Sequence, residues 1–184
     1  MPKVTEEHLA ARRQQILDAA AACFAREGFH RTSMTDIVRE CGVSAGLVYR
    51  YFSSKDEMIA EIVREWHAHR AVALRSGDVA ENYLGLLREV GTADGPDPRL
   101  ALQVWAETVR SPEMRALARS GVDSVRQAAG AVGELPDDAD ALVRVMVAVY
   151  QGLLVQTAWD EELDNAAFVD AVRVLLERVK RGRV

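Results

Sequence analysis

Apolar residues recur along the chain with the spacing of helices, and no stretch alternates apolar and polar residues as strands do. One helix is predicted from Lys55 to about Arg75, with Met58, Ile62 and Trp66 along one side. Further helical segments are predicted at about 79–90, 99–110 and 112–132, separated by loops rich in glycine and proline. The pattern predicts an all-α fold with about nine helices.

The segment from 33 to 55, SMTDIVRECGVSAGLVYRYFSSK, contains several helix starts around one turn. Ser33, Ser44 and Ser54 stand in the N-cap positions that mark these starts. Ser33 and Ser54 are each followed three residues later by an acidic residue, Asp36 and Glu57, as in a capping box. Gly42 lies where the first helix has to end and the chain has to reverse. This layout predicts a helix-turn-helix, with a short second helix from Ala45 to Phe52.

The run GFHRTSMTDIVRECGVSAGLVYRYFSSKDEM, from Gly28 to Met58, resembles the DNA-binding signature of the TetR family of one-component bacterial regulators. The preceding RRQQILDAAAACFAREGF resembles the first helix of that family. One position departs, because Leu47 stands where the family commonly has a small or hydroxylated residue. The resemblance implies a three-helix DNA-binding head at 1–53 and a helical-bundle body at 54–184 that binds an effector and dimerises.

The second helix of the motif has a composition suited to a major groove. Small residues at its start allow close approach, Arg50 offers a bidentate fork to guanine, and tyrosine hydroxyls can reach phosphates. Lys55 is a cation in a first helical turn, where it opposes the helix dipole, so we expect an anion nearby. The predicted DNA-binding residues are Thr32, Ser33, Ser44, Ala45, Gly46, Leu47, Tyr49, Arg50, Tyr51 and Lys55. Arg12 and Arg13 on the first helix are weaker candidates.

The charge distribution bears on this prediction, because the formal net charge of the chain is −5. Residues 1–75 hold 11 basic and 10 acidic residues, whereas residues 76–184 hold 12 and 18. A nearly neutral head on an acidic body should bind DNA weakly with one head alone. We therefore expect a homodimer on a near-palindromic double-stranded operator.

The stretch ALVRVMVAVYQGLLVQTAW at 141–159 is apolar nearly all round. Arg144, Gln151 and Gln156 argue against a membrane span, and burial between the body's core and a second subunit explains the stretch better. The last helix carries one apolar stripe, so a four-helix interface between two subunits is predicted. Its residues are Val149, Gly152, Leu153, Gln156, Phe168, Val172, Leu175 and Leu176. Gly152 could equally be a glycine that faces the core.

The resemblance also implies a small effector inside the body. Large, polarizable or isolated polar residues on the predicted helices are the candidates: Trp66, Tyr83, Leu87, Gln103, Trp105, Thr108, Val109, Met146, Tyr150 and Gln151. For each of them, plain core packing is an open alternative. As a set they favour a mostly apolar, uncharged ligand, while Glu107 leaves room for a cationic one.

Catalysis, cofactors and metals find no support in the pattern. His67 and His69 are spaced i, i+2 and point to different sides of a helix, and no phosphate loop, nucleophile elbow or metal-ligand cluster is visible. Cys23 and Cys41 are predicted to pack in the head, and a reducing cytoplasm is the expected compartment. The sequence thus favours a ligand-released repressor over an effector-independent dimeric DNA-binding protein or a helical small-molecule carrier or enzyme.

Overall fold

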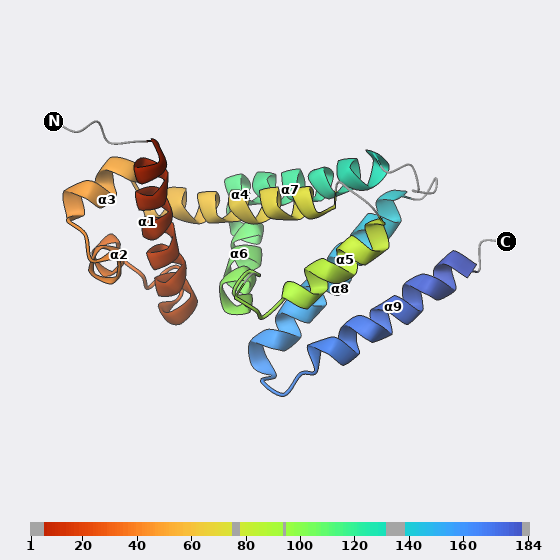
Figure 1. Ribbon diagram of the computed structural model, residues 1–184. Helices are drawn as coiled ribbons and strands as arrows, with labels where there is room; N and C mark the ends of the chain where they lie inside the picture. The colour runs from red at the N-terminus through yellow and green to blue at the C-terminus, as the bar shows by residue number, and fades with distance from the viewer. Residues whose placement is uncertain (1–5, 75–77, 94, 132–138, 182–184) are drawn as a thin grey trace. The chain divides into compact units, whose positions relative to one another are not determined.

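The computed structural model describes residues 6–74, 78–93, 95–131 and 139–181. These ranges contain nine helices and no strand, which confirms the all-α prediction (Figure 1). The helices are α1 (Glu6–Glu27), α2 (Met34–Cys41), α3 (Ala45–Tyr51), α4 (Lys55–Ala73), α5 (Val79–Glu89), α6 (Pro98–Arg110), α7 (Pro112–Ala131), α8 (Ala139–Trp159) and α9 (Asn165–Arg181). Their contacts divide the chain into two units, Met1–Glu65 and Trp66–Val184, and the division falls inside α4.

The first unit has its own apolar core, formed by α1, α2, α3 and the first half of α4. Its most deeply buried side chains are Ile16, Leu17, Ala20, Phe24, Ile37, Val48, Phe52 and Met58. Cys23 and Cys41 are free thiols buried in the same core, where burial raises the pKa of both. The prediction that both cysteines serve packing is confirmed.

Hydrogen bonds at the helix ends explain why the chain breaks where it does. Ser33 and Asp36 form the predicted capping box, and Ser44 accepts a hydrogen bond from the backbone N–H of Leu47 at 3.4 Å. Gly42 ends α2 in the left-handed region, with φ of +69°, which only glycine adopts without strain. The geometry thus fixes both ends of the turn between α2 and α3.

The start of α4 differs in one detail from the prediction. Ser54 caps the helix through the backbone N–H of Glu57, as expected. The Glu57 carboxylate, however, accepts from the backbone and hydroxyl of Ser53, both at 2.8 Å, rather than from Ser54. These bonds lower the pKa of Glu57.

The second unit packs α5, α8 and α9 together with the end of α4, and α6 and α7 lie against α8. Its core comprises Leu74, Tyr83, Leu84, Leu86, Leu87, Val90, Ala101, Met146, Tyr150, Leu153, Leu154, Val169 and Val172. The Tyr83 hydroxyl donates to the Met146 carbonyl at 2.7 Å inside this core, which joins α5 to α8. Asp78, Asp97 and Ser111 cap the starts of α5, α6 and α7.

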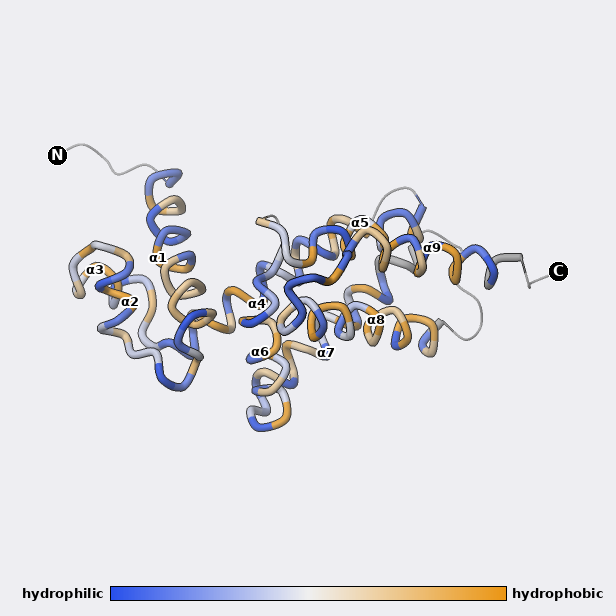
Figure 2. Tube along the Cα trace, turned by 90° about the horizontal axis from the view of Figure 1, so that it is seen from below, coloured by the Kyte–Doolittle hydropathy of each residue, from blue (hydrophilic) through white to orange (hydrophobic). Residues whose placement is uncertain are grey.

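Helix α8 is long and apolar enough to cross a membrane if only length and composition are considered, and Figure 2 shows it largely orange. One of its faces carries Val143, Leu153 and Leu154, which are almost fully buried in the body. This face confirms that part of the apolar run belongs to the body's own core. The loops predicted after the helix from Lys55 to about Arg75 and after the helix at 112–132 lie mostly outside the described residues.

Candidate nucleic-acid interface and ligand cavity

Helix α3 is held in place by two buried side chains and is open on its other side. Val48 and Phe52 anchor it in the head core, at 0% and 1% exposure. Arg13 braces the same anchor, with its guanidinium 5.1 Å from the Phe52 ring centre and 2.7 Å from the Glu61 carboxylate. A rigidly mounted helix can present its remaining residues to a partner without reorganising.

The open side of α3 carries most of the predicted DNA-binding residues. Ser44, Ala45, Gly46, Tyr49 and Arg50 are exposed, and Leu47 and Tyr51 are half-buried. The Tyr49 side chain is 54% exposed, and a methyl group added at Gly46 would meet no atom within 4 Å. The geometry brings these seven residues together on one surface, and their contacts to DNA remain predictions.

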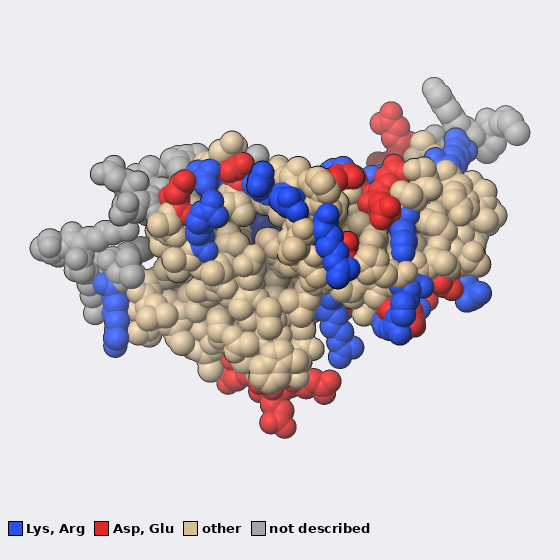
Figure 3. Space-filling model, turned by 180° about the vertical axis from the view of Figure 1, so that it is seen from behind, with Lys and Arg blue, Asp and Glu red and all other residues tan. Residues whose placement is uncertain are grey.

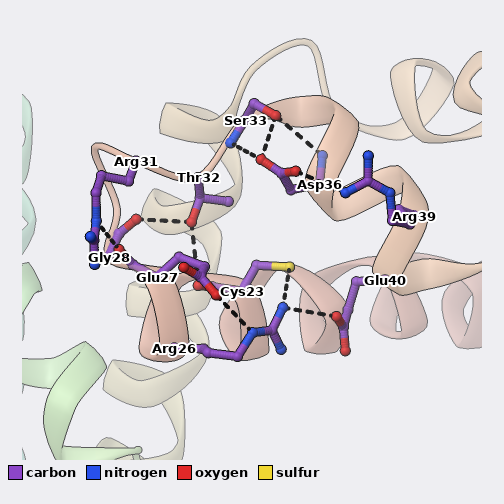
Figure 4. A network of polar contacts seen from close by, with 10 residues as sticks. All are labelled: Cys23, Arg26, Glu27, Gly28, Arg31, Thr32, Ser33, Asp36, Arg39 and Glu40. Atoms are coloured by element: carbon purple, nitrogen blue, oxygen red, sulfur yellow. Dashed lines mark hydrogen bonds and ion pairs between the residues drawn. The ribbon is translucent and has the colours of Figure 1, made fainter.

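The structure places Thr32 inside the head, against its predicted role. Its side chain is only 2% exposed, and its hydroxyl donates to the backbone carbonyls of Gly28 at 2.8 Å and Cys23 at 3.3 Å (Figure 4). A buried hydroxyl with both carbonyls in reach cannot meet a phosphate. Thr32 therefore tightens the turn between α1 and α2, and its assignment as a DNA contact was wrong.

The hydroxyl of Ser33 is exposed but already bonded in both directions. It accepts from the Asp36 backbone N–H at 3.2 Å and donates to the Asp36 carboxylate at 2.6 Å (Figure 4). These bonds lower the pKa of Asp36, so a carboxylate stands at the start of α2. A phosphate approaching Ser33 would have to displace this negative charge.

Lys55 also differs from its prediction. Its ammonium donates to the backbone carbonyls of Phe29, His30 and Thr32 at 2.7, 3.3 and 3.1 Å, and it lies 4.8 Å from the Phe29 ring centre. An ammonium has three donor hydrogens, and these carbonyls use them all. The cation in the first turn of α4 therefore compensates carbonyl oxygens of the loop between α1 and α2, and the phosphate assignment was wrong.

A small apolar cavity lies in the second unit, with a volume of about 60 Å³. Of the predicted ligand-binding residues, Tyr83, Trp105, Met146 and Tyr150 line it. Residues that the sequence did not single out complete the wall: His67, Arg70, Leu74, Leu86, Ala118, Gly121, Val122, Val125 and Val147. The cavity thus draws on α4, α5, α6, α7 and α8.

Three groups in the cavity wall have shifted pKa values. Burial is the main cause that lowers the pKa of His67 to about 4, and the positive charge of Arg70 is the second cause. The imidazole of His67 is therefore neutral at pH 7. Burial raises the pKa of Tyr83 and that of Tyr150, although Arg70, whose guanidinium lies 5.5 Å from the Tyr150 ring centre, opposes the latter shift. Arg70 is thus the charged group of an otherwise neutral wall.

The other predicted ligand residues lie elsewhere. Leu87 is fully buried in the core and Val109 is 75% exposed on α6, so neither can line the cavity, and both assignments were wrong. Trp66 packs against the core, and Gln103 is half-buried outside the cavity wall. Helical spacing places a residue on a face, but it does not tell which face borders empty space.

Thr108 and Gln151 line a second, more open hollow of about 510 Å³ between α6, α7 and α8. Four arginines line it with them: Arg115, Arg119, Arg126 and Arg144. Figure 3 shows basic side chains gathered along this hollowed face. The sequence could have predicted this basic surface, since Arg115, Arg119 and Arg126 at i, i+4 and i+11 share one face of a helix.

The predicted dimer interface is partly turned inward. Leu153 and Val172 are buried in the body's core, at 0% and 7% exposure, so their assignments were wrong. Val149, Phe168 and Leu176 are half-buried against the same core. Among the described side chains of α8 and α9, the apolar residues that remain exposed are Ala141, Val145, Ala148, Val155, Trp159, Ala166, Ala167, Ala171, Val174 and Leu175. Of the rest of the predicted set, Leu175 is exposed, and Gly152 and Gln156 are half-buried.

Known proteins resemble this chain, some in the head alone and others over nearly its whole length. The family model described as bacterial regulatory proteins, tetR family, matches residues 16–62. The transcriptional repressor Rv1474c of Mycobacterium tuberculosis is 31% identical, over 97% of this chain and 100% of the repressor. The uncharacterized regulator YfiR of Bacillus subtilis is 52% identical over 62 residues, which are 34% of this chain and 30% of YfiR.

The fold is also found among solved structures. Salmonella enterica GusR superposes with a TM-score of 0.74 and 25% identity, covering 95% of this chain and 96% of GusR. Both the helix-turn-helix and the full-length similarity lead to one conclusion. The chain belongs to the tetR family of bacterial regulatory proteins and is a DNA-binding transcriptional regulator.

Proposed function

We propose that the protein is a cytoplasmic homodimeric repressor that leaves a near-palindromic operator when a small effector binds in its body. The observation that carries the proposal is the open face of α3, where Gly46, Tyr49 and Arg50 project from a firmly anchored helix. Two such helices, one in each subunit, would enter successive major grooves about 34–36 Å apart. The name of the relative Rv1474c as a repressor supports the direction of regulation.

Arg50 is the residue that we assign to a base edge. No hydrogen bond or ion pair holds its side chain among the described residues, so its guanidinium is available for a guanine. Tyr49, Tyr51 and Ser44 surround it and are assigned to phosphates. Phosphate contacts set the position of the helix on DNA, while Arg50 sets the sequence that is preferred.

The test is selection of DNA fragments with the purified protein, followed by titration of Arg50→Ala on the recovered site. The variant should lose about 1–3 kcal/mol of operator binding and should relax the preference at one base pair. Arg99→Ala is the matched control, because Arg99 is an exposed arginine on α6 and its loss removes the same charge. A uniform loss on all sequences with Arg50→Ala would contradict the base contact.

The dimer is assigned to the exposed apolar residues of α8 and α9. Val145 is 58% exposed, Trp159 is 70% exposed and Leu175 is 60% exposed. Gly152 adds a place of close approach, since a methyl group there would meet no atom within 4 Å. An apolar surface of this kind is covered in a stable protein, and a second copy covers it with two-fold symmetry.

Val145→Glu should convert the protein to a monomer in sedimentation and should abolish tight operator binding. Val109→Glu is the matched control, because Val109 is a comparably exposed valine on α6, away from both helices. A Val145→Glu protein that still sediments as a dimer would remove this face from the interface.

The cavity in the body supports an effector-responsive regulator over a protein whose body only dimerises. A filled body would have favoured the dimeriser, whereas this body has the inner cavity and the adjoining open hollow. His67 and Arg70 line the cavity from α4, the helix that continues into the head. A ligand that binds differently to two positions of α4 would shift the spacing of the two heads and lower operator affinity.

A further inference from the structure

The cavity and the hollow beside it share part of their walls, so the two spaces adjoin. Trp105, Ala118, Val122 and Val147 line each of them. On one side of these four residues the wall is mainly apolar, and on the other side it is mainly arginine. This arrangement is complementary to a molecule with an apolar part and a negatively charged end.

The arginines of the hollow divide into two that are engaged and two that are open. The Arg115 guanidinium donates to the carbonyls of Thr108 at 3.1 Å and Val109 at 2.8 Å, which ends α6. Arg126 pairs with the carboxylates of Asp123 and Asp140. Hydrogen bonds and ion pairs within the protein thus account for the presence of Arg115 and Arg126.

Arg119 and Arg144 differ from Arg115 and Arg126, because no contact of this kind accounts for their charges. Within the part of the chain that the structure describes, neither side chain has a hydrogen bond or an ion pair. Asp123, the acidic residue of the hollow's wall, is taken by Arg126. The hollow therefore carries positive charge that no described residue balances, although the body as a whole is acidic.

Like charges on one helix face are unfavourable unless an anion lies among them. Arg115, Arg119 and Arg126 share a face of α7, and Arg144 lines the same hollow from α8. Guanidinium groups bind carboxylate and phosphate oxygens in a bidentate manner, which a neutral or cationic ligand cannot use. The charge, the shape and the shared wall all fit one class of ligand.

We infer that the effector is an organic oxyanion whose apolar part enters the inner cavity and whose carboxylate or phosphate lies between Arg119 and Arg144. The role of this ligand as an effector rests on the proposed function. A negatively charged ligand replaces the uncharged ligand that the sequence favoured. The inner cavity takes only the end of a short alkyl chain, since a cavity that binds benzene measures about 150 Å³, and the rest of the chain would lie along the wall that the cavity and the hollow share. The head group, not the tail, supplies most of the selectivity.

The first experiment measures binding of four probes with one tail to the full-length protein by calorimetry. The probes are hexanoate, hexyl phosphate, hexanol and hexylamine, with inorganic phosphate as a probe without a tail. One or both hexyl anions should bind at least about tenfold more tightly than the alcohol and the amine. They should also bind more tightly than inorganic phosphate, and the preferred anion identifies the head group.

The second experiment uses a double variant, Arg119→Gln with Arg144→Gln. Since neither side chain has a partner among the described residues, the fold should be kept, and urea unfolding checks this. The double variant should bind the preferred anion about tenfold less tightly and hexanol unchanged. Replacement of both by lysine should restore part of the anion binding, and Arg99→Gln, which removes an exposed arginine elsewhere on the body, should change nothing.

Three outcomes would overturn the inference. Hexanol or hexylamine could bind as tightly as the anions, the double variant could keep full anion affinity, or no probe could bind up to millimolar concentration. Operator affinity is measured separately, with and without the bound anion. If the anion binds as inferred but operator affinity stays the same, the site stands and its role as effector site in the proposed function falls.

Discussion

Acidification should destabilise the protein through His67, and the size of the effect follows from its surroundings. Its ring lines the inner cavity beside Arg70, and burial first, then this charge, lowers its pKa from 6.5 to about 4. Between these two values the unfolded chain binds a proton that the native protein excludes. The free energy of unfolding therefore falls as the pH falls from about 7 to about 4.

The shift corresponds to about 3 kcal/mol if all of it is realised. The His67 ring is not fully buried, so screening by solvent reduces the expected loss to roughly 1–3 kcal/mol. Urea unfolding at a series of pH values, followed by tryptophan fluorescence, measures the effect. Carboxylates titrate in the same range, so the quantity to compare is the difference between wild type and His67→Gln.

The two proteins should diverge as the pH falls below 6.5, with wild type losing more stability. His67→Gln keeps a polar side chain of similar reach but cannot take the proton. If the free energies of unfolding of both proteins fall in parallel between pH 7 and pH 4, His67 is not held neutral by the fold. The cavity wall would then be wetter than its lining residues indicate.

Two further variants test the corrected assignments. Lys55→Met should lower the free energy of unfolding by about 1–3 kcal/mol, because it removes three charged hydrogen bonds to the loop between α1 and α2. The salt dependence of operator binding by the folded variant should stay unchanged, and a salt slope smaller by about one would return Lys55 to the phosphate contacts. Gly121→Ala should lower the free energy of unfolding in urea by about 1–3 kcal/mol, because the new methyl group would lie 2.5 Å from the His67 ring. Adding His67→Ala to this variant should recover part of the loss. An unchanged stability of the single variant would contradict the close contact.

The head could be predicted well because its signals are local. The N-cap serines, the glycine after α2 and the apolar anchors of α3 each act within a few residues, and the structure has them as predicted. The errors in the head concern Thr32 and Lys55, whose partners lie 4 to 26 residues away along the chain. A polar side chain near a helix start has several possible acceptors, and only the folded loop decides among them.

The body could be predicted only as a set of helices. Helix α8 has apolar residues on more than one side, so its sequence period does not distinguish the side that joins the core from the side that stays exposed. Leu153 was therefore expected at a subunit interface but lies in the core, whereas Val145 and Trp159 are exposed and were not singled out. The choice depends on α5 and α6, whose contacts with α8 are distant in sequence.

The arginines of the hollow show the same limit in another form. The total charge of the chain and the excess of acidic residues after residue 76 argue against an anion in the body, but they average over the whole surface. Most of the effect of a charge is felt within about 10 Å, so a ligand senses the residues that line its site. Arg119 and Arg144 line the hollow, and the carboxylate in its wall is already paired with Arg126. An acidic protein can thus hold a basic site, and only the fold tells where that site lies.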